Sequence, residues 1–533
     1  MPKIVSRRNL FSLLNSVSAG NGTRKFAPLS DPLAPFVPDA NNPWDALRAG
    51  HLLRRAMMSP TWPDITALVA LGDPGKAVDL VLSSASTPAV PSMANDGTEN
   101  PYPLALPAQY PIFGKWASDA AALRAWWAGL HRAASNSIQE KMTAFWSGHF
   151  TTQFDLGGQQ YVIAPLLYRQ NQLFRASGLG NFKDLVKSVT LDGAMLVYLG
   201  GNQNSVGAAN ENYAREMMEL FTCGLGGGYT ETDIHAAARI LTGWRVGQYT
   251  NDAAPNGIFN TWFDPTQHDT GDKTYFETDF PAIDATTNTE YLVKQNEIYR
   301  MVDVLFDKTA DSIANFISTK LYKFFVYSDP DTTSESVEQS VIAAMATLFQ
   351  SPSNNWEIKP VVSALLKSAH FFDNNNIGAQ IKTPAEYVIG MARQLAPSYG
   401  IDANMTAIDE QFFQPPNVSG WPGYHDWITT STYPTRGTDA GAAIKMMDDN
   451  AAIAFVEQFP NYTDVNALST AIGQLLLPRP LSTDRQTTFA QKLAGTTQTY
   501  EWASILASSP ATAAANIRDL LNYISSLPDF ELC

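Results

Sequence analysis

A histidine and an aspartate stand side by side at His268 and Asp269, in a stretch rich in threonine, glycine and aromatic residues. A histidine beside a carboxylate can act as a base whose tautomer the carboxylate fixes, or it can bind a divalent metal. Glu216 is a further carboxylate suited to act as base or ligand. We therefore predict His268, Asp269 and Glu216 as catalytic residues. The alternative is that Asp269 caps the turn while His268 packs on Trp262.

A metal site at this position would need two or three more ligands from elsewhere in the chain. His149 and Glu211 are chemically suitable, so His149, Glu211 and His268 form our candidate ligand set for a divalent metal whose identity the sequence leaves open. No H-E-x-x-H spacing is present to sharpen this prediction. His149 also ends an otherwise apolar helix, where a core histidine bonded to a carbonyl group is the competing interpretation.

Five other polar or aromatic residues are predicted to bind substrate. Arg215 would hold an anionic group, with Asn210 and Lys273 nearby in the proposed cleft. Asn417 and Trp421 belong to the segment PPNVSGWPG, whose prolines and glycines fix the backbone and suit the placement of a side chain against a ligand. Two alternatives remain open: the helix that carries Arg215 presents a solvated face of i,i+4 ion pairs, and the PPNVSGWPG loop is a structural clamp.

The elements that must position these residues are mostly helices. Residues 210–244 follow the pattern helix, glycine turn, helix, with apolar positions repeating at the helical period. Gly224 ends the first helix, Thr230 and Asp233 begin the second as a capping box, and Gly243 closes it. Most of the remaining chain shows the same periodicity. We therefore predict a mainly α, large multi-helix globular protein.

The segment 245–289 departs from the helical pattern. It is rich in asparagine, aspartate, threonine and aromatic residues. Residues 259–263 and 273–276 have the composition of short strands, so we predict a small β-hairpin insertion near residues 258–277 in which these two stretches pair.

Several sequence blocks resemble, in order, the signature blocks of the bacterial domain of unknown function 1800 family. They include NENYAREMMELFT and LTGW within residues 210–244, and further blocks at residues 51–61, 145–150, 191–204, 263–275, 318–326, 381–390 and 415–428. The resemblance implies no established activity. It does imply a possible partner, because members of this family are often encoded beside an exported, sulfatase-like protein.

The first residues of the chain resemble a twin-arginine export signal. Arg7 and Arg8 precede an apolar pair, a short apolar stretch follows, and residues 17–19 could form a small-residue cleavage site. The alternative is an amphipathic N-terminal helix. We predict an exported protein, periplasmic or extracellular.

The predicted organisation has four parts. Residues 1–25 form the export signal and the proline-rich residues 26–44 a linker. Residues 45–450 form the helical domain, with an irregular insertion at 245–290, and residues 451–533 add helices that pack on it.

Composition excludes several classes of protein. A net charge of −15 and a pI near 4.9 argue against nucleic-acid binding, which needs a basic surface. No apolar run approaches the roughly 18 residues of a transmembrane helix. Two cysteines make neither a disulfide framework nor a thiolate metal site.

These predictions together favour a hydrolase that acts on an extracytoplasmic substrate through a metal or a His–Asp pair. The alternative is a non-catalytic interaction or assembly partner of the co-encoded, exported sulfatase-like protein.

Overall fold

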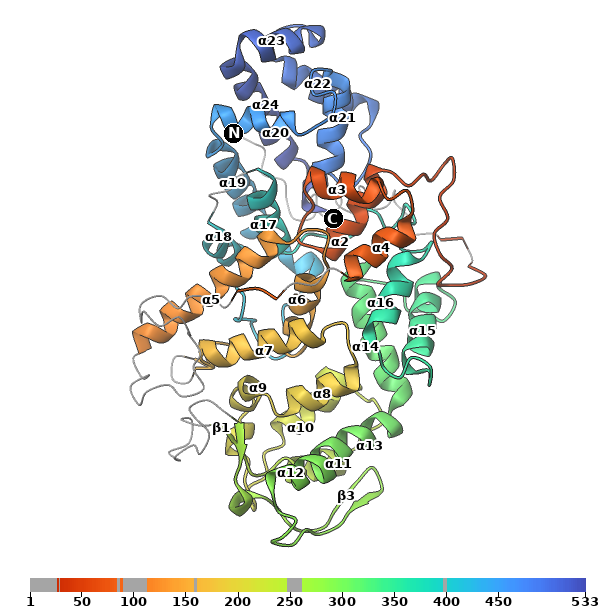
Figure 1. Ribbon diagram of the computed structural model, residues 1–533, viewed down its shortest axis with the longest axis vertical. Coiled ribbons are helices and arrows are strands. Elements are labelled where there is room, and N and C mark those ends of the chain that lie inside the picture. The colour runs from red at the N-terminus through yellow and green to blue at the C-terminus, as the bar shows by residue number, and fades with distance from the viewer. Residues whose placement is uncertain are drawn as a thin grey trace.

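The computed structural model describes residues 26–27, 29–83, 87–89, 113–157, 161–246, 261–395 and 400–533. The molecule is elongated, with three tiers of helices along its long axis (Figure 1). The helices of the middle tier are α2 (Ala46–Ala56), α3 (Trp62–Val69), α4 (Pro74–Ser83), α5 (Phe113–Ala133), α6 (Gln139–His149), α14 (Ala310–Phe325), α15 (Val337–Gln350), α16 (Ile358–Lys367), α17 (Pro384–Gln394) and α18 (Ile401–Ala407).

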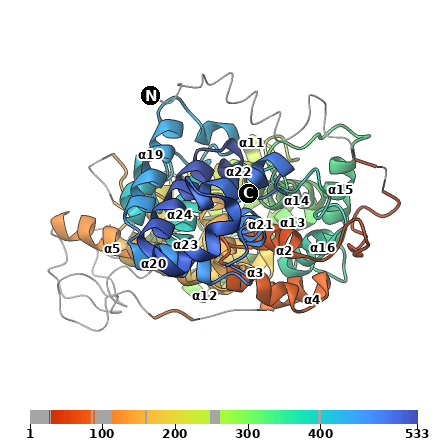
Figure 2. The same ribbon diagram turned by 90° about the horizontal axis from the view of Figure 1, so that it is seen from above.

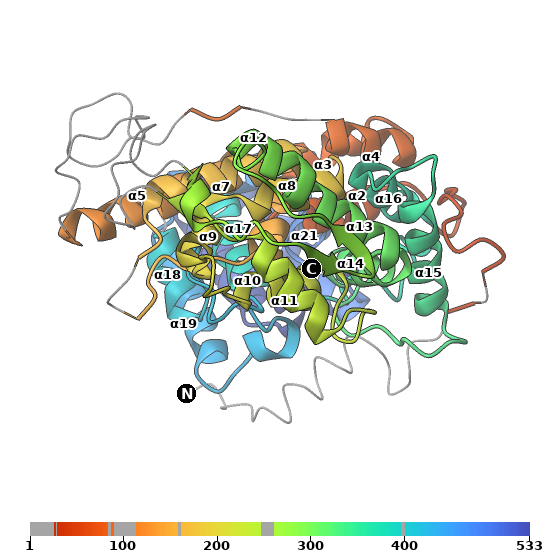
Figure 3. The same ribbon diagram turned by 90° about the horizontal axis from the view of Figure 1, so that it is seen from below.

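The two outer tiers come from different parts of the chain. Seen from above, the C-terminal helices cover one end of the molecule (Figure 2), and seen from below, helices from residues 182–308 cover the other (Figure 3). The C-terminal tier contains α19 (Thr432–Lys445), α20 (Asp449–Glu457), α21 (Val465–Leu476), α22 (Thr483–Ala494), α23 (Trp502–Ser508) and α24 (Pro510–Ser525). The opposite tier contains α8 (Phe182–Thr190), α9 (Gly193–Tyr198), α10 (Asn212–Glu216), the π-helix η2 (Met217–Thr222), α11 (Glu231–Ile240), α12 (Glu290–Val293), the π-helix η4 (Lys294–Tyr299) and α13 (Arg300–Lys308), with α7 (Ala164–Ser177) next to the middle tier.

Helix starts are encoded locally. α3, α11 and α17 each begin with a capping box, in which a threonine side chain accepts a hydrogen bond from the third helical residue and that residue's carboxylate accepts one from the threonine N–H. The box at α17 uses Thr383 and Glu386, so it fixes a glutamate at the start of this helix.

Two buried arginines of α2 bind the C-terminal ends of other helices, one in the C-terminal tier and one in the middle tier. Arg54 of α2 donates to the carbonyl groups of Leu475 and Leu477 at the end of α21, at 3.1 and 3.0 Å. Arg55 donates to the carbonyl of Phe325, the last residue of α14, at 3.1 Å. A cation at a helix C-terminus meets carbonyl groups that have no partner within the helix, which stabilises both contacts.

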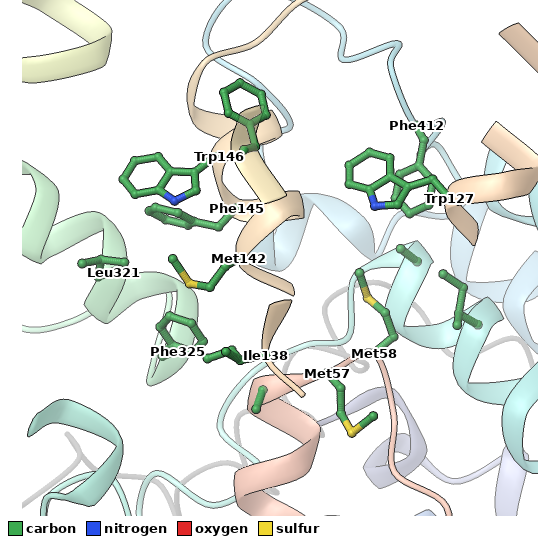
Figure 4. Close-up of a cluster of buried hydrophobic side chains, with 14 of the residues drawn as sticks. Met57, Met58, Trp127, Ile138, Met142, Phe145, Trp146, Leu321, Phe325 and Phe412 are labelled. Carbon is green, nitrogen blue, oxygen red and sulfur yellow. The ribbon is translucent and has the colours of Figure 1, made fainter. Parts of the chain in front are cut away.

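The apolar core surrounds α6. Figure 4 shows Met142 and Phe145 of α6 pointing toward Leu321 and Phe325 of α14, while Trp127 lies beside Phe412 on the other side. Trp146, fully buried, donates from its indole nitrogen to the carbonyl of Gly178 at 2.8 Å. α6 is therefore held rigidly on several sides.

The prediction of a mainly α fold with a small β insertion is confirmed, but the pairing within the insertion is different. β1 (Trp244–Val246) pairs with β2 (Thr261–Phe263), and β3 (Lys273–Tyr275) pairs with β4 (Thr278–Phe280), both antiparallel. The predicted pairing of residues 259–263 with 273–276 is wrong, because each strand has a different partner. Residues 259 and 260, like the predicted export signal at 1–25, lie outside the described residues.

Across the part of the chain that the structure describes, no helix combines the length and the apolar character needed to cross a membrane.

Candidate functional site

The predicted pair His268–Asp269 does not act as a pair. The side chain of His268 is fully buried, with Nδ1 2.9 Å from the carbonyl oxygen of Thr242 and Nε2 3.0 Å from Glu297. Asp269 instead forms two hydrogen bonds with Arg239, at 2.7 and 3.1 Å, which hold the pKa of its carboxyl below the usual range. The Asp269 carboxylate therefore positions the Arg239 guanidinium and does not hold the His268 imidazole.

Lys273, predicted to bind substrate, belongs to the same buried cluster as His268. Its Nζ lies 2.6 Å from Glu297, so the Glu297 carboxylate in η4 contacts both Lys273 and His268. The cluster ties β3 and the preceding turn to η4, and none of its members lines the cavity described below. This arrangement is that of a structural ion cluster.

The polar face of α10 is a surface ion cluster. Arg215 contacts Glu231 at 2.7 Å, and Glu211 and Glu219 at 3.3 Å each. Glu231 keeps 75% of its side chain exposed, and such pairs contribute little to stability. This geometry matches the solvated-face alternative for Arg215.

Two other predicted residues of this segment have local partners. Asn210 shapes a turn, because its N–H donates to Asn204 at 2.8 Å and its amide donates to the carbonyl of Gly200 at 3.2 Å. Glu216 is partly buried, and burial together with nearby Glu219 raises its pKa.

The three predicted metal ligands have separate partners. Glu211 contacts His235 at 3.2 Å, His268 contacts Glu297, and His149 contacts the carbonyl of Phe221 at 2.8 Å. In the described ranges, no group of three or more histidine, cysteine, aspartate or glutamate side chains is arranged to hold a metal ion. His149, Glu211 and His268 are thus not brought together.

A different site emerges in the middle tier. A cavity of about 440 Å³ lies among α6, α14, α17 and the loop at residues 419–427. That volume suits a small organic ligand. Its wall contains four cations, two carboxylates, a histidine and several aromatic rings: Arg55, Lys141, Lys320, Lys323, Glu386, Glu410, His149, Trp127, Phe145, Phe324, Phe412, Trp421, Tyr424 and Trp427.

The predicted PPNVSGWPG loop forms part of this wall. Gly420 adopts a φ of +86°, and a Cβ there would lie 2.6 Å from the carbonyl oxygen of Gly148 in α6. Only glycine permits this close approach. It seats the loop on α6 and places Trp421 at the cavity, whereas exposed Asn417 accepts the N–H of Ser419 at 2.8 Å and stabilises the turn. Of the two predicted substrate-binding residues of this loop, Trp421 lines the cavity and Asn417 does not.

Two carboxyl groups in the wall have opposite pKa shifts. Burial would raise the pKa of Glu386, but contact with Lys141 and the nearby Arg55, 3.6 Å away, lowers it below the usual range. Burial raises the pKa of Glu410 to about 7, an effect that nearby Glu386 strengthens and the hydrogen bond from Ala385 N–H, at 2.8 Å, partly offsets. Glu386 is therefore ionised at neutral pH, while Glu410 exchanges its proton there.

The π-helix η2 links α10 to the cavity. Sequence periodicity predicts one continuous helix over residues 208–221, but from Met217 the helix widens to i→i+5 hydrogen bonds, such as Cys223 N–H to Met218 at 2.9 Å. The carbonyl of Phe221 accepts from His149 Nε2 at 2.8 Å, and that of Leu220 accepts from Lys320 at 3.3 Å. Widened turns of this kind are frequent at functional sites.

Sequence reasoning named His149 and Trp421 but missed the charged groups of the cavity. A signal was available, because Arg55, Lys320 with Lys323, and Glu386 lie in three of the blocks that resemble the family signature, at residues 51–61, 318–326 and 381–390. Each of these blocks has helical periodicity, which favours a packing role for the whole block. Glu410 lies outside the quoted blocks.

Comparison with known proteins gives a family and no close relative. No curated protein and no solved structure matches the chain. The sequence model of a family described as "Protein of unknown function (DUF1800)" matches residues 51–532. The match covers nearly the whole chain, and the protein therefore belongs to the DUF1800 family.

Proposed function

We propose that the protein is a hydrolase whose active site is the cavity among α6, α14 and α17, with Glu410 as the proton-transfer group. The observation that carries the proposal is the pair Glu386 and Glu410 in one cavity wall. Two carboxyl groups whose surroundings push their pKa values apart are typical of acid–base sites. The buried cluster of His268, Lys273 and Glu297 does not line this cavity, and we therefore do not assign the reaction to it.

The proposed reaction needs only water and the substrate. Ionised Glu410 accepts a proton from water as the water oxygen bonds to the electrophilic atom of the substrate, and the bond to the leaving group breaks. Glu410 then returns that proton to the leaving group, so atoms and charge balance. Glu386 stays ionised and holds Lys141 and Arg55 in place. Burial, with a smaller contribution from the charge of Glu386, keeps the pKa of Glu410 near neutral.

A panel of 4-nitrophenyl carboxylic esters, glycosides, phosphate and sulfate tests this proposal through release of 4-nitrophenolate. We expect turnover of at least one class, with kcat/KM rising through about pH 7 as Glu410 ionises. Glu410→Gln keeps an acceptor for Ala385 N–H but cannot take a proton, and should lower kcat by about 100-fold or more.

Glu338→Gln provides a matched control. Glu338 is also buried and also accepts a backbone N–H, that of Asp331 at 2.8 Å, but it does not line the cavity. Turnover that Glu410→Gln leaves unchanged, or no turnover of any panel member by the wild-type protein, would refute the proposed reaction.

Export is part of the proposal and rests on Arg7 and Arg8 in the N-terminal sequence. Replacing both by lysine should leave the full chain in the cytoplasm, which cell fractionation would measure. An unchanged distribution between the fractions would contradict it.

The second candidate function is assembly with a co-encoded, exported sulfatase-like protein, which the family resemblance suggests. It predicts that this neighbour co-purifies with the chain and that Glu410→Gln does not disturb the complex. Absence of the neighbour from purified material would remove this candidate.

A further inference from the structure

Lys320 is the group in the cavity whose surroundings most need explanation. It lies in α14, one turn before Lys323, and both lysines line the cavity. Its Nζ donates to Nδ1 of His149 at 3.1 Å and to the carbonyl of Leu220 at 3.3 Å. Neither acceptor carries a negative charge, because one is an imidazole nitrogen and the other a backbone carbonyl group.

His149 must be uncharged in this arrangement. Its Nε2 carries the hydrogen that is donated to the carbonyl of Phe221 at 2.8 Å, which leaves the lone pair on Nδ1 to accept from Lys320. Burial, and then the charge of Lys320, place the pKa of His149 well below its usual value. The histidine therefore orients the ammonium group without neutralising it.

Several other buried cations are paired with carboxylates, whereas buried Arg54 and Lys382 donate to carbonyl groups and do not line the cavity. Lys141 contacts Glu386, Lys273 contacts Glu297, Arg175 contacts Glu140, Arg436 contacts Glu531 and Arg393 contacts Asp64. Among the described residues Lys320 has no such ion pair, and its strongest charged neighbour is another cation, Lys323. Burial and Lys323 together lower its pKa to about 8.

An unpaired cation in a protein wall is costly, and a cavity in front of it gives room for the missing anion. We infer that the ligand of this cavity carries an oxyanion group that Lys320 and Lys323 bind together, with an apolar or aromatic body on Phe324, Trp421 and Tyr424. This names the substrate class for the same cavity and rests on the proposed function only in calling that ligand the substrate. Carboxylate, sulfonate and phosphate groups share the required chemistry.

Equilibrium binding by calorimetry tests the inference without any turnover. The probes are 2-naphthoate and its neutral isostere 2-naphthamide, measured on the full chain at pH 7. We expect the carboxylate to bind at least about 10-fold more tightly, the factor for one charge-assisted contact of about 1.4 kcal/mol. 2-Naphthalenesulfonate and 2-naphthyl phosphate then show which oxyanion the two lysines prefer.

Variants assign the preference to Lys320. Lys320→Met should abolish the preference for carboxylate over amide, Lys320→Arg should keep most of it, and Lys76→Met, on the exposed face of α4, should leave it unchanged. The preference should also fall as the pH is raised through about 8, because Lys320 loses its charge. Equal binding of the two probes, a preference that survives Lys320→Met, or no binding of any probe at millimolar concentration would overturn the inference.

The two proposals fail separately. Glu410→Gln removes from the cavity wall a carboxyl group that is partly ionised at pH 7, so turnover should be lost while the preference for carboxylate over amide persists or increases. Binding without any turnover would refute the hydrolase and keep the anion site. Equal turnover of neutral and acidic esters, with no preference for carboxylate in binding, would refute the anion site and keep the hydrolase.

Discussion

Replacing Lys320 by methionine should stabilise the protein at neutral pH. The amine has an ordinary pKa of 10.5 in the unfolded chain and about 8 in the folded protein, because burial and Lys323 disfavour its charged form. This difference corresponds to a penalty of about 3 kcal/mol when both states are protonated. Methionine fills a similar volume and carries no charge, so it removes the penalty.

The sign of the pH dependence follows from proton binding. Between pH 8 and pH 10.5 the unfolded chain holds more protons at this position than the folded protein. The destabilisation caused by Lys320 therefore decreases, and the wild-type protein becomes more stable, as the pH rises. The full penalty applies below pH 8 and falls to about 1 kcal/mol at pH 10. The advantage of the variant over the wild type should therefore shrink by about 2 to 3 kcal/mol between pH 7 and pH 10.

Urea unfolding at these two pH values measures the difference directly. The lost hydrogen bonds to His149 and Leu220 cost about 1 kcal/mol each, but they are lost at both pH values and do not affect the comparison. Lys76→Met is the exposed control and should show no such trend. An advantage that stays constant with pH, or grows as the pH rises, would refute the argument that Lys320 is an unpaired cation in a poorly solvated wall.

Two further predictions concern positions that hold the fold. Glu297→Gln should destabilise the protein by about 3 to 5 kcal/mol, because Lys273 and His268 lose their shared carboxylate; a loss below about 1 kcal/mol in urea unfolding would contradict a structural role for this cluster. Gly420→Ala should cost about 2 to 3 kcal/mol, since its Cβ meets the Gly148 carbonyl, whereas Gly72→Ala, with positive φ but open space, should cost about 1 kcal/mol; equal losses would remove the close-approach argument.

The helices could be predicted from sequence because their determinants are local. Thr230 and Asp233 form the predicted capping box of α11, and Gly224 adopts the positive φ expected after the first helix of the motif. The widening of η2 could not be predicted, because the carbonyls of Leu220 and Phe221 find their partners on α14 and α6, and apolar periodicity alone carries no information about such contacts.

The candidate site was harder to predict because adjacency in sequence is a poor guide to contact. His268 and Asp269 are neighbours in the chain, yet their side chains meet Glu297 and Arg239. Conversely, His149 and Lys320 are separated by 171 residues and touch. Residue type indicated which side chains could do chemistry, and only the tertiary packing decides which of them share a cavity.

The central claim is that the cavity among α6, α14 and α17 is where this protein binds its ligand. A crystal structure of the chain soaked with 2-naphthoate tests it most directly. We predict the carboxylate within about 3 Å of Lys320 Nζ and the ring against Trp421. Ordered naphthoate at another place, such as the surface cluster around Arg215, with the cavity empty, would contradict the claim.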